Sequence, residues 1–454
     1  MQSSSHAQLT EALSQALGPG AVFAGEAALE KAQSSWMRLG APIAVVYPKS
    51  TGEVSAMLRI AHRFGWPVTP WGGKTGLAGG AMAQDAVALS LERMNAIEDI
   101  DVASATMTVQ AGAILQTACE AAEAEGLLLP LDLGARGSAT IGGNISTNAG
   151  GNRVLRYGMM RDMVLGLEAV LADGTVVSSM NRLMKNNTGY DLKQLFIGSE
   201  GTLGVVTRAV LRLRSAPVSQ NTAYLAVADF DAIPRLGGGL SAFEVMWPAF
   251  YDLVTTEPAK GKPPLPRGYP YYILVESLGG DKAADAERFE QVLGQALEDG
   301  LVVDAVIAKS QAEQAKMWAL RDDVGQVNRN GPAITFDVSL RIADMPAYVA
   351  EIEDKLRACW PKVDTYVFGH LGDGNLHVLV WPGEQGPGIK KAVEDIVYGP
   401  LEAIGGSVSA EHGIGLSKKA YLPMSRNAGE LALMKALKTL LDPQSILNPG
   451  KILD

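Results

Sequence analysis

The chain has 454 residues, of which 47% are hydrophobic and 19% charged, and its formal net charge is −10. A chain of this length buries a large core, and its length favours about two to four domains. The composition excludes a disordered chain. The acidic balance argues against a nucleic-acid partner, because such binding depends on Lys and Arg that neutralise phosphates. Glycine is the outlier, since 50 of 454 residues is about 11%, against a typical ~7%.

The two cysteines, Cys119 and Cys359, lie in segments with helical patterns and lack C-x-x-C spacing. We therefore expect two reduced, buried thiols and neither a disulfide framework nor a cysteine metal site. Residues 1–8 are polar and lack the apolar run of a signal peptide. No segment approaches the ~18 uncharged apolar residues of a membrane span. These features predict a soluble, cytoplasmic protein.

The first half of the chain carries several local signals for secondary structure. Ser50 and Glu53 form an S-x-x-E capping box, which predicts a helix to about residue 64. The turn sequence Asp173-Gly174 between two alternating segments, 165–172 and 175–178, predicts a hairpin. Other apolar runs predict strands at 42–47, 68–69, 86–91, 106–112 and 203–213, and a helix at 114–125.

After Pro217, long helical patterns alternate with short apolar runs, and residues 259–270 form a Pro-rich surface loop. Helices are expected near 283–299, 310–328, 344–358 and 390–404, and strands near 271–276, 334–341, 364–369 and 376–381. The pattern indicates two α+β regions that meet near residue 217, rather than the regular βαβ alternation of a doubly wound sheet.

Glycine concentrates in two clusters, at residues 71–80 and 131–151, with a third short group at 198–204. Glycine permits positive φ and removes side chains, so successive amides in such loops can converge on an anion. Two such loops fit a large cofactor that has both a pyrophosphate and a hydrogen-bonding ring system. For one cluster alone, tight turns would be a sufficient explanation, but three clusters make that explanation hard to sustain.

Two familiar nucleotide-binding motifs are disfavoured. Gly73-Lys74-Thr75 resembles the end of a P-loop, but Val68 occupies the leading glycine position. The glycines that follow would each weaken a helix by about 1 kcal/mol relative to alanine. A nucleotide hydrolase is therefore disfavoured. A Rossmann domain is also disfavoured, because no G-x-G-x-x-G lies between a strand and a helix.

Three of the five histidines fall in two short motifs, Gly369–His377 and Ser409–Gly415. Apolar segments flank the turn Gly372-Asp-Gly-Asn375, so His370 and His377 should lie at one end of a hairpin on facing strands. Imidazole and carboxylate ligands suit Zn, Mn or Fe, and Glu411 could complete such a set. The spacing H-x6-H is no standard zinc signature, so a metal site and a hydrogen-bonded structural pair both remain open on this evidence.

The runs 70–80, 131–151 and 195–207, with Leu447-Asn-Pro-Gly-Lys451, resemble the vanillyl-alcohol-oxidase/PCMH-type flavoproteins. Within these, the resemblance is to the FAD-linked D-lactate, glycolate and D-2-hydroxyglutarate dehydrogenase group, from about residue 38 onward. It implies an α+β fold in three parts. These are a PCMH-type two-subdomain FAD-binding domain at 1–216, a substrate domain of the FAD-linked oxidase type at 217–425, and a helical segment at 426–454 that returns to the FAD domain.

By this resemblance the first loop holds the FAD pyrophosphate, the second surrounds the ribityl chain and isoalloxazine, and residues 201–206 follow the adenine side. Members with covalent FAD often carry a histidine in the first loop, where this chain has Lys74, so we expect non-covalent FAD. The implied FAD-binding residues are Trp71, Gly72, Gly73, Lys74, Thr75, Gly76, Leu77, Gly79, Leu133, Gly134, Ser138, Thr140, Gly142, Gly143, Asn144, Thr147, Ala149, Gly150, Gly151, Tyr157, Gly158, Glu200, Gly201, Val206 and Asn448.

The resemblance also implies a divalent metal, most often Zn with Mn or Fe as alternatives, on His370, His377 and Glu411. His412 matches the proposed general base of the group and Arg321 its carboxylate-binding arginine. A metal would lower the pKa of the substrate hydroxyl, a histidine can take its proton near neutral pH, and flavin accepts the hydride. Without the resemblance, Arg321 would read equally well as a solvated helical charge.

Substrate choice depends on three positions. Members acting on D-2-hydroxyglutarate carry a lysine two residues before the position of Asp337 and a polar residue two after the second metal histidine. This chain has Thr335 and Leu379 there, and Gly325 where a hydroxyl is common. An unpaired buried carboxylate is costly, so we predict D-lactate or a longer apolar D-2-hydroxy acid. D-2-hydroxyglutarate is one alternative, and a metal-dependent hydrolase of the same fold is another.

The expected partners are the small 2-hydroxy acid and an electron acceptor other than oxygen, such as an electron-transfer flavoprotein, a cytochrome or a quinone. Base rates favour a homodimer.

Overall fold

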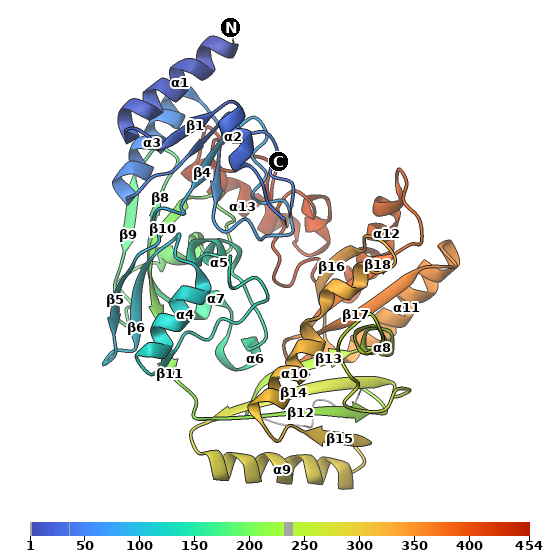
Figure 1. The fold of residues 1–454 in the computed structure, drawn as a ribbon. Coiled ribbons are helices and arrows are strands. Elements are labelled where there is room, and N and C mark those ends of the chain that lie inside the picture. The colour runs from blue at the N-terminus through green and yellow to red at the C-terminus, as the bar shows by residue number, and fades with distance from the viewer. Residues whose placement is uncertain (1, 36, 231–238) are drawn as a thin grey trace. The chain divides into compact units, whose positions relative to one another are not determined.

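The computed structural model describes residues 2–35, 37–230 and 239–454, which form two compact units (Figure 1). The first unit comprises Met1–Gly150, Gly158–Ala216 and Glu411–Asp454, and the second comprises Gly151–Tyr157 and Pro217–Ala410. The return to the first unit begins at Glu411, whereas the sequence analysis placed it at residue 426. It begins earlier because the backbone that follows Glu411 hydrogen-bonds to Ala78 and Glu200 of the first unit.

The first unit contains a four-stranded sheet in the order β1 (Val22–Ala24), β2 (Ala44–Val46), β4 (Val87–Ser90), β3 (Val68–Trp71). β2, β4 and β3 are parallel, and β1 is antiparallel to β2. The helix α3 (Thr51–Phe64) begins where its cap predicts, since the Ser50 side chain accepts a hydrogen bond from the Glu53 amide. Val45, Tyr47 and Trp71 lie in the core packed on this sheet.

A second, antiparallel sheet of the first unit has the order β5 (Ile97–Asp101), β6 (Thr106–Gln110), β10 (Val205–Arg212), β8 (Val164–Val170), β9 (Val176–Ser179). The predicted hairpin is confirmed, because β8 and β9 pair around a turn in which Gly174 has φ +84°. β7 (Leu127–Leu128) and β11 (Arg214–Ser215) form a small separate pair.

The other helices of the first unit are α1 (Gln2–Leu17), α2 (Glu26–Lys31), α4 (Leu115–Ala124), α5 (Ile141–Thr147), α7 (Met160–Met163) and α13 (Ala428–Leu441). Two 3-10 helices, η1 (Leu192–Leu195) and η7 (Lys419–Met424), accompany them. The helix α5 lies inside the second glycine cluster, where the sequence analysis expected a loop. It is capped by Thr140, whose side chain accepts from the Gly143 amide.

The second unit is built on a seven-stranded antiparallel sheet, drawn in yellow-green to orange in Figure 1. Its order is β15 (Asp304–Ile307), β12 (Ser219–Val227), β14 (Tyr271–Gly279), β13 (Leu240–Met246), β17 (Asp364–His370), β18 (Asn375–Trp381), β16 (Ile334–Ser339). Pairing between adjacent strands therefore brings residues of β13, β17, β18 and β16 together. Many of the paired residues are far apart in sequence.

The helices of the second unit are α6 (Val154–Tyr157), α8 (Pro248–Thr255), α9 (Lys282–Glu298), α10 (Gln311–Asp322), α11 (Met345–Cys359) and α12 (Ile389–Tyr398), with 3-10 helices at Val324–Asn328, Ile342–Asp344, Leu371–Asp373 and Gly399–Leu401. Phe250 and Tyr251 of α8 and Met317 and Leu320 of α10 pack into one buried cluster with Phe368 and other residues of one sheet face. On the opposite face, the Phe336 ring meets Tyr398 of α12 edge-on.

Both cysteines are free and lie on helices, as expected, but only one of them is buried. Cys119 of α4 is buried, and burial raises its pKa to about 11. Cys359 ends α11 and is exposed, so the prediction of a buried thiol there is wrong. Its helix ends at the surface.

Within the described ranges, no helix has both the length and the apolar character that crossing a bilayer requires.

Candidate active site

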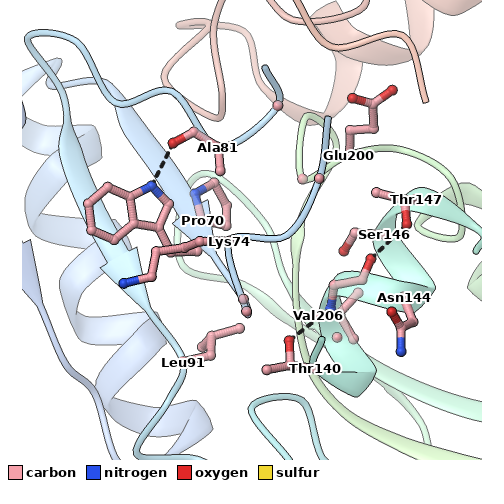
Figure 2. Close-up of a pocket in the computed structure, with 18 of the residues that line it drawn as sticks. Pro70, Lys74, Ala81, Leu91, Thr140, Asn144, Ser146, Thr147, Glu200 and Val206 are labelled. Carbon is pink, nitrogen blue, oxygen red and sulfur yellow. Dashed lines mark hydrogen bonds between the residues drawn. The ribbon is translucent and has the colours of Figure 1, made fainter. Parts of the chain in front are cut away.

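A pocket of the first unit lies between the first glycine cluster, α5 and the start of β10 (Figure 2). The Trp71 indole N–H donates to the Ala81 carbonyl across the first loop (2.7 Å), which closes the loop on itself. Lys74 has φ +57°, and its ammonium lies 5.3 Å from the centre of the Trp71 ring. No helix follows Gly73-Lys74-Thr75 in the described structure. The P-loop reading therefore has no support in the fold.

Close backbone packing explains several of the glycines. A Cβ at Gly73 would lie 1.9 Å from the Ser138 carbonyl oxygen, and one at Gly72 would lie 2.5 Å from the Thr140 hydroxyl. A Cβ at Gly142 would lie 2.6 Å from that of Ala111. The two clusters thus pack against each other at Gly72 and Gly73, where there is no room for a side chain.

The pocket fits a cofactor with hydrogen-bonding groups. Asn144 lines it, and its side-chain amide nitrogen is buried with no hydrogen-bond partner among the described residues. Such an unsatisfied donor costs about 1–3 kcal/mol, which a bound acceptor recovers. The side chains of Ser146 and Thr147 also border the pocket. The donor-rich, glycine-walled cradle has the chemistry that a flavin dinucleotide requires.

The structure places many, but not all, of the predicted FAD-binding residues on this pocket. Those that line it are Trp71, Gly72, Gly73, Lys74, Thr75, Gly76, Thr140, Gly142, Gly143, Asn144, Thr147, Glu200, Gly201 and Val206. Those outside its lining are Leu77, Gly79, Leu133, Gly134, Ser138, Ala149, Gly150, Gly151, Tyr157, Gly158 and Asn448. Gly151 and Tyr157 belong to the second unit. Lining residues that the prediction omitted include Pro70, Ala81, Leu91 and Ser146.

His412 also lines this pocket, and the half-buried carboxylate of Glu200 holds the backbone that follows it. Glu200 accepts hydrogen bonds from the amides of Ile414 (2.7 Å) and Gly415 (2.9 Å). Burial raises the pKa of Glu200, against the lowering effect of these amides and of Lys418. The loop that carries the predicted general base is thus anchored inside the first unit.

In the second unit, two histidine–carboxylate pairs lie on four adjacent strands, offset from each other by two residues, because His377 pairs with Phe368 of β17. Glu244 of β13 pairs directly with His370 of β17, and Asp337 of β16 pairs directly with His377 of β18. All four residues are buried. The two imidazole rings are 5.4 Å apart between centroids, which confirms the predicted hairpin with both histidines at one end.

The Nδ1 atom of each histidine faces its paired carboxylate. His370 Nδ1 lies 2.9 Å from Glu244 Oε1, and His377 Nδ1 lies 4.0 Å from Asp337 Oδ1. Burial by itself would raise the pKa of Glu244, but His370 and Arg321 outweigh this and lower it overall. Glu244 is therefore ionised at neutral pH.

Arg321 lies at the end of α10 and is buried, not solvated. Its Nε donates to Glu244 Oε2 at 2.9 Å, and its Nη2 lies 3.3 Å from His370 Nε2. Its guanidinium also lies over the Phe368 ring, 5.0 Å from the ring centre. The predicted carboxylate-binding arginine and the first predicted metal ligand thus share one buried carboxylate.

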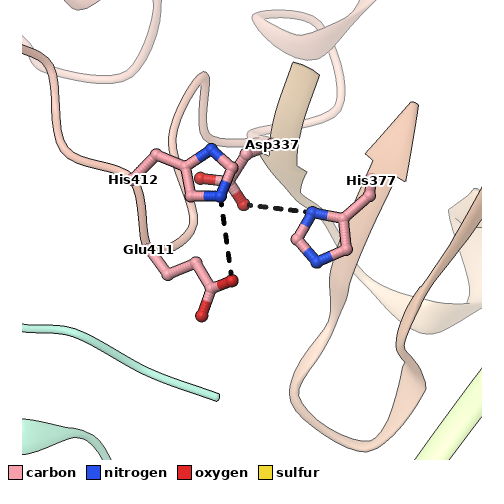
Figure 3. A group of neighbouring side chains, drawn as sticks. All are labelled: Asp337, His377, Glu411 and His412. Carbon is pink, nitrogen blue, oxygen red and sulfur yellow. Dashed lines mark ion pairs between the residues drawn. The ribbon is translucent and has the colours of Figure 1, made fainter. Parts of the chain in front are cut away.

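Glu411, the third predicted metal ligand, directly follows Ala410, whose backbone is hydrogen-bonded within the second unit. The Ala410 amide donates to Asp337 Oδ2 at 3.1 Å, and Glu411 is the next residue, so its Cα lies ~3.8 Å from that of Ala410. Figure 3 draws Asp337 and His377 with Glu411 and His412, which are all of residue types that bind metal ions. His412 Nε2 lies 3.9 Å from the Glu411 carboxylate.

The sequence analysis missed Glu244 and Asp337 as site residues. Each interrupts an otherwise apolar strand, Ala242-Phe-Glu-Val-Met246 and Ile334-Thr-Phe-Asp-Val338. A charged residue in a buried strand is uncommon and informative. The unusual position of these two carboxylates could therefore have been recognised from the sequence, although the sequence does not identify the residues that they contact.

Comparison with known proteins agrees with this architecture. Residues 42–179 match the family described as an FAD binding domain, and residues 215–452 match the family of FAD linked oxidases, C-terminal domain. The chain is similar to p-cresol methylhydroxylase, whose substrate-bound crystal structure aligns with a TM-score of 0.80 at 17% identity, over 99% of this chain and 97% of that one. This confirms the predicted PCMH-type fold.

Curated relatives are much more similar in sequence. A D-2-hydroxyglutarate dehydrogenase of Xanthomonas citri pv. viticola is 41% identical over 91% of this chain and 89% of its own. The mitochondrial D-2-hydroxyglutarate dehydrogenase of Bos taurus is 40% identical over 96% and 81%.

The fold and the glycine-walled pocket define an FAD-linked oxidoreductase built of two compact units. The chain belongs to the FAD-binding D-2-hydroxyacid dehydrogenases of the PCMH-type family.

Proposed function

We propose that this dehydrogenase oxidises a D-2-hydroxy acid with a short apolar side chain, such as D-lactate, to the 2-oxo acid. The observation that carries the proposal is the surroundings of His377. Leu379, two residues along β18, is buried on the same sheet face, opposite Tyr366 of β17 and Thr335 of β16. Thr335 is exposed, but next to the buried, uncharged Leu379 and Tyr366 a second substrate carboxylate would be costly.

D-2-hydroxyglutarate is the second candidate substrate. It is favoured by the names of relatives that are about 40% identical over nearly the whole chain. For this substrate, a cation other than the absent lysine would have to meet the distal carboxylate. The two candidates differ only in what the substrate side chain meets, so one set of assays distinguishes them.

FAD is proposed to bind non-covalently in the glycine-walled pocket, where it would accept the C2 hydride of the substrate. The amides of the first loop and of α5 supply donors for its phosphates, and the Asn144 amide is a free donor for its polar groups. Members of the family with covalent FAD often attach it through a histidine in or near the first loop, where this chain has Lys74.

His370, His377 and Glu411 are proposed to hold a divalent metal, with zinc as the first choice and Mn or Fe as alternatives. Two imidazoles and a carboxylate are a donor set that suits these ions. A metal there would supply Lewis-acid polarisation of the substrate hydroxyl.

The remaining chemistry falls to two side chains. His412 Nε2 or Nδ1 takes the hydroxyl proton, since histidine is the residue best suited to accept a proton near neutral pH. Arg321 binds the substrate carboxylate through its planar fork of donors. Its guanidinium is held at a defined place by Glu244. The reduced flavin then passes its electrons to an acceptor other than oxygen, such as an electron-transfer flavoprotein, a cytochrome or a quinone.

The test is a dye-linked assay of the full chain with FAD and Zn²⁺, using D-lactate, D-2-hydroxybutyrate and D-2-hydroxyglutarate. The highest kcat/KM is expected for an apolar acid. Thr335→Lys should shift the ratio of kcat/KM values toward D-2-hydroxyglutarate, because it places a cation opposite Leu379. Thr365→Lys, on the other face of the same sheet, is the matched control. If the protein oxidises none of these three acids, the proposal is refuted.

A further inference from the structure

The two histidines proposed as metal ligands have buried carboxylate partners that are fixed by the sheet itself. Glu244 and His370 are direct cross-strand neighbours, as are Asp337 and His377. These carboxylates are almost fully buried, with residue exposures of 1% for Glu244 and 0% for Asp337. Glu244 lies 2.9 Å from His370 Nδ1, at hydrogen-bond distance, and Asp337 Oδ1 lies 4.0 Å from His377 Nδ1, at ion-pair distance. Each carboxylate is thus on the Nδ1 side of its histidine.

Glu244 selects one tautomer of the His370 ring. A carboxylate can only accept, so the Nδ1 atom that faces Glu244 carries the proton. Arg321 Nη2 lies 3.5 Å from Nδ1 and 3.3 Å from Nε2, so the guanidinium approaches both ring nitrogens and does not distinguish them. His370 therefore presents Nε2 as the basic nitrogen.

Asp337 is itself held in place for the same task at His377. Its Oδ1 accepts from the Asn375 amide group at 2.9 Å, and its Oδ2 accepts from the Ala410 backbone amide at 3.1 Å. These two hydrogen bonds hold the carboxylate beside His377, with Oδ1 4.0 Å from Nδ1. The second imidazole therefore has a charged neighbour on the same side as the first.

We propose that Glu244 and Asp337 are positioning residues that fix the tautomer and ring orientation of His370 and His377, so that both Nε2 atoms are presented to one divalent cation. The inference rests on the metal site of the proposed function. Carboxylates behind metal-bound histidines hold the ring and increase its basicity, and their loss typically weakens metal binding by about 10- to 100-fold.

The two carboxylates differ in one respect that a kinetic measurement can detect. Glu244 also accepts a hydrogen bond from Arg321 Nε, whereas Asp337 accepts from the Asn375 side chain and the Ala410 backbone amide. Glu244→Gln should therefore weaken metal binding and also raise KM for the hydroxy acid. Asp337→Asn should weaken metal binding with a smaller effect on KM at saturating metal.

The experiment measures Zn²⁺ affinity of the chelator-treated, FAD-loaded full chain by competition with a chromophoric chelator. Glu244→Gln and Asp337→Asn should each raise the dissociation constant by about 10-fold or more. Glu276→Gln is the matched control. Glu276 is a buried carboxylate on the neighbouring strand β14, bonded to Arg153 and Trp318, not to a histidine. It should keep the wild-type affinity.

The outcomes separate the inference from the proposed function. If the wild type binds Zn²⁺ and His377→Ala abolishes binding, while both carboxylate variants keep wild-type affinity, the inference is overturned and the metal site stands. If the wild type binds no Zn²⁺, or His377→Ala leaves binding intact, the metal site itself is wrong.

A second measurement needs no variant that could fail to fold. The chain has only five histidines, so selective ¹⁵N-histidine labelling gives resolvable two-bond correlations. Two histidines should show the Nδ1–H tautomer at neutral pH in the zinc-loaded protein. Zinc-sensitive histidine signals with the Nε2–H tautomer would contradict the inference.

Discussion

Glu200 accepts a hydrogen bond from the backbone amide of Gly415, and this contact joins the wall of the flavin pocket to the loop that begins with Glu411 and His412. The Ile414 amide donates to the other oxygen of the same carboxylate. Both residues follow His412 within three positions, so the contact fixes where the proposed general base enters the pocket.

Glu200→Gln should therefore impair both stability and flavin reduction. A glutamine has one acceptor oxygen, so one of the two amides loses its partner, at a cost of about 1–3 kcal/mol in the free energy of unfolding. The variant should also displace His412, the proposed general base, so that flavin reduction by the substrate slows by about 10-fold. Urea unfolding and stopped-flow absorbance measure these effects. Glu98→Gln, which breaks an exposed ion pair with Arg208, should change stability by under about 1 kcal/mol.

His412→Asn tests the general base directly. The variant should still bind FAD, because the pocket is built mainly from the glycine loops and α5. Flavin reduction by substrate should fall by ~100-fold or more, since proton removal loses its acceptor. A reduction rate equal to that of the wild type would remove His412 from the mechanism.

Gly73→Ala tests the contact between the two glycine clusters. Its Cβ would meet the Ser138 carbonyl oxygen at 1.9 Å, so the loops must separate, at a cost of about 1–3 kcal/mol or more. The purified variant should be colourless or should lose FAD on dialysis. Gly137→Ala, where a Cβ meets nothing within 4 Å, should keep its flavin. Equal FAD affinity in both variants would contradict this account of the cradle.

Lys451 should give a distinct pH dependence of stability. Burial, with a further effect of Lys419, lowers its pKa from 10.5 to about 8. Between these values the unfolded chain keeps a proton that the folded chain has released, so this lysine makes stability rise with pH through that window. The difference in unfolding free energy between wild type and Lys451→Met should grow in favour of the wild type from pH 8 to 10. A pH-independent difference would show that the pKa is not lowered.

The sequence predicted those features that depend on neighbouring residues. The Ser50 cap, the Asp173-Gly174 turn and the hairpin that carries His370 and His377 are all local, and the structure confirms each. α5 was missed because glycine disfavours helices, yet Gly142 is needed where the helix meets Ala111.

The role of Glu244 was not predictable in the same way. Its partner His370 lies 126 positions away and meets it only through the register of β13 and β17. A strand pattern shows that a charge is out of place, but cross-strand pairing decides which residue it meets. The same holds for Asp337 and His377.

The most direct test of the central claim is an anaerobic visible spectrum of the purified, FAD- and Zn²⁺-loaded protein, recorded before and after each of three acids is added. We predict flavin absorbance that is bleached by D-lactate and unchanged by L-lactate or D-2-hydroxyglutarate. Bleaching by D-2-hydroxyglutarate alone would contradict the apolar-substrate proposal and establish the second candidate. Flavin that no D-2-hydroxy acid reduces would contradict the account as a whole.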